Sequence, residues 1–285
     1  MAAPVKRITI NDIREMKQNG EKIAMLTAYD YPTAKIIDNC NIPLILVGDS
    51  LGMVVLGYDT TLPVTMDVMI HHCKAVVRGA EHAMIVGDMP FMTYHISIED
   101  AMRNAARFIQ EAGVQAVKLE GGVTVADKVK RIVDCGIPVM GHIGMTPQSV
   151  NQLGGHLVQG KKPEVAQRLI DDAKALEQAG AFSVVLEGIP ARLAALITQN
   201  VSIPTIGIGA GAECDGQVQV INDILGLSDF IPKHAKQYTK IRNTMAQAVD
   251  DYRKEVQAGQ FPTKENSYII DTAVLDQVKA KLVQG

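Results

Sequence analysis

The stretch PLILVGDSLG, residues 43–52, decides the fold of this chain. Its apolar run stops at Asp49, which is typical of a buried parallel strand that carries a polar residue at its end. The same pattern returns three times downstream, where apolar runs end at Asp88, Glu120 and Glu187. Four carboxylates at the ends of four strands predict one site that binds a cation and performs acid–base chemistry.

Eight runs of this kind predict a closed parallel (β/α)8 barrel of the TIM-barrel class, rather than a doubly wound sheet. They lie near residues 23–28, 43–48, 84–88, 115–120, 138–143, 182–187, 204–209 and 218–222, and helical segments alternate with them. Part of the order is an internal repeat, because the run that ends at Glu120 and the Ile-Pro pair at Ile137 recur at Glu187 and Ile203.

No linker or break in composition divides the chain, so we expect a single domain over residues 1–285, with the barrel at about 20–260. Thr9 and Asp12 form the start of a helix over residues 9–19. A C-terminal extension, residues 263–285, carries Val274, Leu275, Val278 and Leu282 on one helical face. We expect this tail to dock on the barrel or on a neighbouring subunit.

The composition is typical of a soluble globular protein. Hydrophobic residues make up 47% of the chain and charged residues 21%, and a net charge of −3 gives no basic field for nucleic acid or an anionic membrane. No apolar run approaches the ~20 residues of a spanning helix, and the N-terminus has no apolar signal core. The four scattered cysteines are typical of reduced thiols. We therefore expect a cytoplasmic protein without nucleic-acid or membrane partners.

The predicted strand ends carry the chemistry, because barrels of this class place their active sites there. Asp49 and Asp88 each follow a glycine and are the best candidates for Mg²⁺ ligands, since Mg²⁺ takes one or two carboxylates and leaves other positions to water and substrate. Glu120 is a third candidate, through water. Zn²⁺ is disfavoured, because no cluster of cysteine and histidine has the usual spacing.

Lys118 lies two residues before Glu120, so both side chains point to the barrel interior. The lysine is either paired with an interior acid or a ligand for an anionic substrate. A small 2-oxo acid could chelate the cation, which would then stabilise the enolate formed by removing a proton from the adjacent carbon. Glu187 is the candidate general base on another strand. For each acid taken alone, a structural ion pair is the competing interpretation.

Three other motifs have both a functional and a structural interpretation. The glycine-rich turn at 207–211 resembles a phosphate-binding loop but lacks the Walker lysine and the dinucleotide spacing, so a tight strand-to-helix turn with close packing is the favoured interpretation. Gly154 and Gly155 indicate a loop over the site. The run His71–Cys73 falls in a predicted helix, where adjacent residues do not share a face, so packing explains it better than metal binding.

A series of ordered motifs resembles the ketopantoate hydroxymethyltransferase family from about residue 5 to residue 268. They are LTAYD at 26–30, VGDSLG at 47–52, TLPVT at 61–65, DMPFM at 88–92, VKLEGG at 117–122, GHIGMTPQ at 141–148, VQG at 158–160 and IGIGAG at 206–211. Each motif is weak alone, but their combination in this order is specific. The resemblance implies a (β/α)8 barrel that forms a homo-oligomer, often a decamer.

The resemblance also implies an activity. Members of this family transfer a hydroxymethyl unit from 5,10-methylenetetrahydrofolate to 3-methyl-2-oxobutanoate, which gives 2-dehydropantoate in pantothenate and coenzyme A biosynthesis. The matching positions here are, for Mg²⁺, Asp49, Asp88 and Glu120; for the oxo acid, Asp49, Ser50, Asp88, Lys118 and His142; and for accepting the proton, Glu187.

Three positions depart from the pattern of the family. His156 stands where an aromatic residue is expected, Gly188 where cysteine is common, and His234 where phenylalanine is common. None is a proposed site residue, so the departures concern loop packing and the fit of the folate.

The principal alternative is an Mg²⁺-dependent carbon–carbon lyase of the phosphoenolpyruvate and isocitrate lyase barrel group. The pair Lys118 and Glu120 and the loop 146–148 favour the transferase. A non-catalytic scaffold is the third hypothesis, and it predicts that the strand-end acids are lost, whereas all of them are present.

Overall fold

The eight strands form a closed parallel barrel in the computed structural model, which describes residues 6–282. Each strand pairs with the next, and β8 pairs with β1 to close the barrel. The strands are β1 (Ile23–Thr27), β2 (Leu44–Val47), β3 (Met84–Asp88), β4 (Ala116–Glu120), β5 (Val139–Gly144), β6 (Ser183–Glu187), β7 (Thr205–Ile208) and β8 (Gly216–Gln219). The predicted (β/α)8 class is confirmed.

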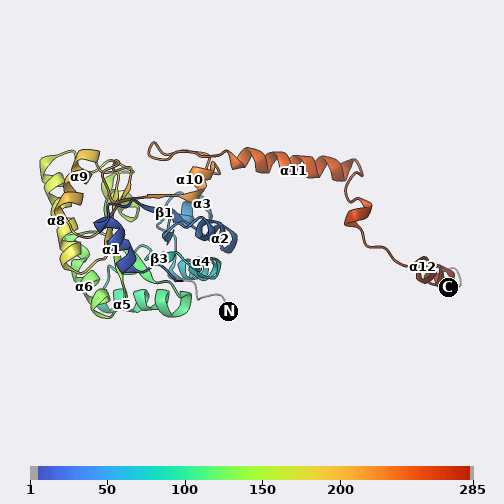
Figure 1. The fold of residues 1–285 in the computed structure, drawn as a ribbon, viewed down its shortest axis with the longest axis horizontal. Coiled ribbons are helices and arrows are strands. Elements are labelled where there is room, and N and C mark those ends of the chain that lie inside the picture. Colours follow the sequence, from blue (N-terminus) through green and yellow to red (C-terminus); the bar gives the residue numbers. More distant parts are fainter. Residues whose placement is uncertain (1–5, 283–285) are drawn as a thin grey trace.

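Helices surround the barrel and follow most of the strands (Figure 1). They are α1 (Ile10–Gln18), α2 (Tyr31–Asn39), α3 (Leu51–Val54), α4 (Met66–Gly79), α5 (Ile98–Arg107), α6 (Ala126–Asp134), α7 (Val150–Leu153), α8 (Pro163–Gln178), α9 (Ala191–Asn200), α10 (Ile221–Leu225), α11 (Ile241–Gln257) and α12 (Thr272–Leu282). Three-residue 3₁₀ turns lie at Val123–Val125, Pro147–Ser149 and Lys264–Asn266, and a π-helical turn at Phe108–Ala112 continues α5.

The last strand begins earlier than the apolar pattern predicts. Closure pairs Gly216 with Ile23 of β1, so the strand starts at the glycine, and Ile221 already belongs to α10. Gly216 is needed there, because a Cβ at this position would collide with the Ile23 carbonyl oxygen. The prediction of a strand near 218–222 was therefore wrong in its second half.

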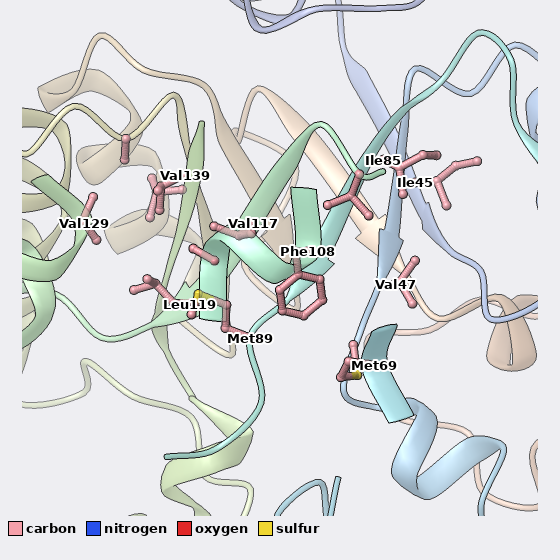
Figure 2. Packing of buried hydrophobic residues seen from close by; sticks show 14 of the residues in the cluster. Ile45, Val47, Met69, Ile85, Met89, Phe108, Val117, Leu119, Val129 and Val139 are labelled. Atoms are coloured by element: carbon pink, nitrogen blue, oxygen red, sulfur yellow. The ribbon is translucent and has the colours of Figure 1, made fainter. Parts of the chain in front are cut away.

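Alternating side chains on each strand build two apolar cores. The barrel interior is filled by one cluster, which includes Leu46, Val86, Ala116, Met140 and Phe182. The second cluster lies between strands and helices, where Figure 2 shows Ile45, Val47, Ile85, Val117, Leu119 and Val139 near Met69, Phe108 and Val129. Because the inward row of β3 contains Val86 and that of β4 contains Ala116, the next inward positions toward the strand ends are Asp88 and Lys118.

Helix α1 closes the N-terminal end of the barrel. Ile13 is fully buried in the interior cluster, and Ile8, Ile10 and Met16 pack against it. The predicted capping box is present, with Thr9 and Asp12 bonded to each other's backbone N–H. Lys17 fixes the helix to the barrel by donating to the carbonyl oxygens of Val201 and Ile203. The strand-end acids therefore lie at the end of the barrel opposite to the one that α1 closes.

The C-terminal part leaves the barrel. Figure 1 shows α11 running away from the strands and α12 at its far end, and neither helix has a buried residue. Of the two docking places expected for the tail, its own barrel is excluded for the residues described, up to Leu282, and a neighbouring subunit stays a prediction. Within the same described range, no helix combines the length and the apolar character needed to cross a bilayer.

Candidate active site

A buried ion cluster occupies the C-terminal end of the barrel. Lys118 and Glu120 of β4 and Asp88 of β3 point into the barrel, as their strand positions predict. Lys118 Nζ lies 2.7 Å from Asp88 Oδ1 and 4.0 Å from Glu120 Oε1. Asp49 joins the cluster through its backbone N–H, which donates to Asp88 Oδ2 at 3.2 Å. All four residues are at most 5% exposed, so their charges interact with little screening by water.

The charges in this cluster are unbalanced. Burial opposes the charge of Lys118, but Asp88, Glu120 and Asp49 outweigh it and raise the pKa of its ammonium. Burial, reinforced by Asp88, raises the pKa of Asp49 to about 7. Burial also raises the pKa of Glu120 well above its usual range, although Lys118 opposes this. Three carboxyls that share one ammonium favour the binding of a further cation.

His142 of β5 connects the ammonium to the fourth acid. Its Nδ1 lies 3.2 Å from Lys118 Nζ, and its Nε2 lies 3.2 Å from Glu187 Oε2 at the end of β6. Burial, followed by the charge of Lys118, lowers the pKa of His142, so the imidazole is neutral. An ammonium can only donate, so Nδ1 accepts and the ring hydrogen lies on Nε2, facing Glu187. Glu187 is thereby tied to the cluster.

Ser50 follows Asp49 at the start of α3 and is only partly buried. The hydroxyl of Tyr29, which follows β1, lies 2.9 Å from Ser50 Oγ. Gly48 leaves room for the Ser50 hydroxyl, because a Cβ at position 48 would lie 2.9 Å from Ser50 Oγ. Burial raises the pKa of the Tyr29 phenol, which stays protonated and can hold the serine in place.

Loop residues that the strand pattern does not reveal complete the site. Tyr94 and Gln148 are buried and hydrogen-bonded to each other at 2.6 Å, and Gln148 Nε2 donates to Asp49 Oδ2 at 2.8 Å. Thr61 is also buried, with 2% of its surface exposed. The sequence signal for Gln148 is its place in the motif GHIGMTPQ, which gives it no role.

The structure thus brings every predicted site residue into one connected group, although their roles stay predictions. The run His71–Cys73 and the glycine-rich turn at 207–211 both make packing contacts. His72 Nδ1 bonds to the carbonyl oxygen of Tyr29 at 2.6 Å. A Cβ at Gly211 would collide with Ala191, so packing alone accounts for a glycine in that turn.

The donor set fits a hard cation such as Mg²⁺. Thr61 Oγ1, His142 Nε2 and Asp88 Oδ1 are buried and make no hydrogen bond of good geometry to the residues that the structure describes, although Asp88 Oδ1 forms the ion pair with Lys118. Within residues 6–282, no three acid, histidine or cysteine side chains gather closely enough to hold an ion by themselves. Two carboxylates, from Asp49 and Asp88, with water or substrate at the other positions are an ordinary arrangement for Mg²⁺.

Glu120 is already engaged by the protein. Its Oε2 accepts from the backbone N–H of Gln148 at 3.0 Å, and its Oε1 faces His142 Nδ1 at 3.6 Å. A contact to the cation through a water molecule fits this arrangement better than direct ligation.

Comparison with known proteins places the chain in a family. The family described as ketopantoate hydroxymethyltransferase matches residues 7–264. The chain belongs to this family. It is 66% identical over 274 residues to the 3-methyl-2-oxobutanoate hydroxymethyltransferase of Dehalococcoides mccartyi strain CBDB1, covering 96% of this chain and 98% of that one. It is 57% identical over 267 residues to the enzyme of the same name from Heliobacterium modesticaldum, covering 93% and 97%.

Solved structures that resemble this member of the ketopantoate hydroxymethyltransferase family share its fold at low sequence identity. Phosphonopyruvate hydrolase matches with a TM-score of 0.60 and 9% identity, covering 97% of both chains. The 2,3-dimethylmalate lyase, described as a PEP mutase/isocitrate lyase superfamily member, matches with a TM-score of 0.57 and 15% identity, covering 92% of this chain and 99% of that one. These likenesses support the barrel and carry no activity over to this chain.

Proposed function

We propose that this protein transfers a hydroxymethyl unit from 5,10-methylenetetrahydrofolate to 3-methyl-2-oxobutanoate, forming 2-dehydropantoate. Membership of the ketopantoate hydroxymethyltransferase family supports the reaction, and the connected cluster of Asp49, Asp88, Lys118, His142 and Glu187 carries it to this site. The C3–H bond of the oxo acid breaks and a bond from C3 to the one-carbon unit forms. Water supplies the hydroxyl oxygen, and tetrahydrofolate leaves.

The oxo acid binds at the buried end of the cluster. Its carboxylate and ketone carry negative charge and lone pairs, which the ammonium of Lys118 and the hydroxyl of Ser50 can meet as donors. A divalent cation held by Asp49 and Asp88, with Glu120 behind a water, would supply a Lewis acid for the ketone oxygen.

Glu187 accepts the C3 proton. It is only partly buried, with 14% of its side chain exposed, whereas the other acids of the cluster are covered. It also lies at the end of β6, whereas the carboxylates that would bind the cation are Asp49, just after β2, and Asp88 of β3. His142 Nε2 lies 3.2 Å from Glu187 Oε2, so the imidazole borders this carboxylate, although Nε2 makes no hydrogen bond of good geometry to the residues described.

Exchange of the C3 proton in heavy water tests this assignment without folate. The protein with Mg²⁺ should exchange the proton of 3-methyl-2-oxobutanoate faster than Mg²⁺ alone. Glu187→Gln should slow the exchange by at least about 100-fold, the usual contribution of a general base, while the oxo acid still binds. Proton NMR measures the exchange, and calorimetry measures the binding.

Glu177→Gln is the matched control. Glu177 lies at the other end of the barrel and accepts hydrogen bonds from the backbone N–H and hydroxyl of Ser202. The same change there should leave exchange at the level of the unaltered protein. Exchange that survives in Glu187→Gln would move the base elsewhere, and no exchange in the unaltered protein would remove the enolisation step.

The proposed partners are small molecules and further copies of the same chain. A homo-oligomer, with a decamer as the expected size, is supported by α11, where Met245, Val249, Tyr252 and Val256 form an exposed apolar stripe. The outer face of β8 has no long helix of its own, and a pocket of about 650 Å³ lies there beside Ala24, Gln217 and His234. We assign the stripe to this face of a second copy.

Action in the cytoplasm is part of the same proposal. All four cysteines, Cys40, Cys73, Cys135 and Cys214, are free thiols in the structure, which is usual for proteins of a reducing compartment.

A further inference from the structure

Gln148 contacts the site from three directions. It lies just after β5, in the 3₁₀ turn Pro147–Ser149, and is 4% exposed. Its Nε2 donates to Asp49 Oδ2 at 2.8 Å and to the carbonyl oxygen of Met89 at 3.0 Å. Its backbone N–H donates to Glu120 Oε2 at 3.0 Å. One residue thus bridges the ends of β2, β3 and β4.

Tyr94 fixes the remaining atom of the amide. The backbone N–H of Glu120 donates to the Tyr94 hydroxyl oxygen at 3.1 Å, so the hydroxyl hydrogen is free to point elsewhere. It is donated to Gln148 Oε1 at 2.6 Å. Together with the bond from Gln148 to Glu120 Oε2, these contacts close a ring of three hydrogen bonds.

The direction of each bond follows from the chemistry of the partners. The Met89 carbonyl oxygen can only accept, so the amide nitrogen of Gln148 must face it. The Glu120 N–H can only donate, so Tyr94 must give its own hydrogen to Gln148 Oε1. Both hydrogens of the Gln148 amide are then committed, and Asp49 Oδ2 always receives one of them.

We propose that Gln148, held by Tyr94, is the positioning residue that orients the Asp49 carboxylate for the cation. Asp49 Oδ2 is kept as a hydrogen-bond acceptor, which would leave Oδ1 available to the ion. This inference rests on the proposed cation site and extends it to two residues that make no contact with the ion. Partners of this kind are commonly worth 10- to 100-fold in metal affinity.

The test measures binding of Mn²⁺ to the folded protein without substrate, by the electron paramagnetic resonance signal of the free ion. Gln148→Met keeps the length of the side chain and removes both donors to Asp49 and Met89. It should weaken binding by about tenfold or more. Tyr94→Phe leaves the donors in place but frees the amide, so it should weaken binding by a smaller factor.

The double variant distinguishes positioning from general damage. If Tyr94 acts through Gln148, adding Tyr94→Phe to Gln148→Met should not weaken Mn²⁺ binding further. An additional loss equal to that of Tyr94→Phe alone would show that the two residues act independently and would overturn the proposal.

Gln115→Met is the matched control for stability. Gln115 lies next to the start of β4, where it accepts from the Ile85 N–H at 2.9 Å and donates to the Gly113 carbonyl oxygen at 2.8 Å. The change should lower the melting temperature in the way that Gln148→Met does, yet leave Mn²⁺ affinity within about twofold of the unaltered protein.

The failure of the cation site and the failure of the inference have different signatures. If the unaltered protein binds no Mn²⁺, or binds it equally after Asp49→Ala, the cation site itself is wrong. If Asp49→Ala abolishes binding while Gln148→Met, still folded by circular dichroism, binds within twofold of the unaltered protein, the positioning role is overturned.

Discussion

The ammonium of Lys118 determines which groups can be charged at the buried end of the site. Lys118 Nζ forms an ion pair with Asp88 at 2.7 Å, and its contact with Nδ1 of His142 fixes the tautomer of that ring. The ion pair of Asp88 and the tautomer of His142 are therefore both set by Lys118, a group of the protein itself.

Replacing the ammonium of Lys118 should weaken the binding of the oxo acid. Lys118→Met should weaken the affinity for 3-methyl-2-oxobutanoate by about 10- to 100-fold, because a hydrogen bond to a charged group is worth about 1.5–3 kcal/mol. It should also destabilise the fold by about 3–5 kcal/mol, since a buried carboxylate loses its partner. Calorimetry with Mg²⁺ and urea unfolding measure the two effects.

Lys17→Met provides the comparison at the floor of the barrel. Lys17 forms an ion pair with Asp215 at 3.0 Å and bonds to two backbone carbonyls, so its loss should reduce stability. Affinity for the oxo acid should not change. Normal affinity in Lys118→Met would exclude the lysine as a substrate ligand.

The site was predictable from the sequence only where a residue continues a strand. Asp88, Lys118 and Glu120 follow from strand register alone. Tyr94 and Gln148 do not, because they reach the acids from loops whose path no periodicity describes. The role of Ser50 came from the family resemblance, since a serine after a strand end has no distinctive chemistry.

At the scale of elements, helix α2 is joined to β3 by one carboxylate. Asp38 is 4% exposed, and its oxygens accept from the backbone N–H groups of Glu81 at 2.9 Å, His82 at 3.0 Å and Ala83 at 2.7 Å. These are the residues just before β3, so Asp38 satisfies a turn that would otherwise bury three donors.

Asp38→Asn should lower the free energy of unfolding by about 2–3 kcal/mol at pH 7, because an amide cannot accept from all three donors. Burial opposes the charge, but the backbone and His82 hydrogen bonds hold the pKa of Asp38 below its usual 3.8. Its contribution is therefore complete above pH 3.8 and is lost as the pH falls through the folded pKa. Urea unfolding between pH 7 and 3 should show the difference from the unaltered protein shrinking in that range.

Asp67→Asn is the surface control. Asp67 pairs with Arg107 at 2.7 Å, but its side chain is 85% exposed, and surface pairs contribute about 0–1 kcal/mol. An equal loss from both variants would mean that the turn before β3 does not depend on Asp38.

Prediction and structure agree where the apolar pattern decides: the sequence predicts a helix at about 66–79, and α4 spans that range. Agreement ends where packing decides. Alanine, isoleucine and phenylalanine on one face predict a continuous helix over residues 98–112, yet a π-helical turn begins at Phe108. The Phe108 ring lies where a Cβ at Gly87 would be, and this fit between helix and strand is invisible in the periodicity.

At the scale of the whole molecule, α11 runs away from the barrel, and among the residues described it meets its own chain at Phe261, whose ring packs against that of Tyr252. Its stripe of Met245, Val249, Tyr252 and Val256 is between 45% and 67% exposed, which is typical of a surface that is covered by another subunit.

Val249→Asp should reduce the mass of the assembly in sedimentation velocity, because it places a charge within the apolar stripe. Asn243→Asp introduces the same side chain on the opposite side of the helix, two positions from Met245, and should leave the mass unchanged. A monomeric unaltered protein, or an unchanged mass in Val249→Asp, would contradict self-association through α11.

The floor formed by α1 has a consequence for the order of events. Ile13 seals one end of the barrel, so reactants enter and products leave through the same mouth, past the partly covered Ser50 and Glu187. In the reaction proposed above, the small oxo acid needs the deepest groups, so we expect it to bind before the larger folate, and tetrahydrofolate to leave before the product. A barrel that is closed at one end thus favours ordered binding. A large excess of the folate should therefore inhibit turnover, because it would block the entrance before the oxo acid binds.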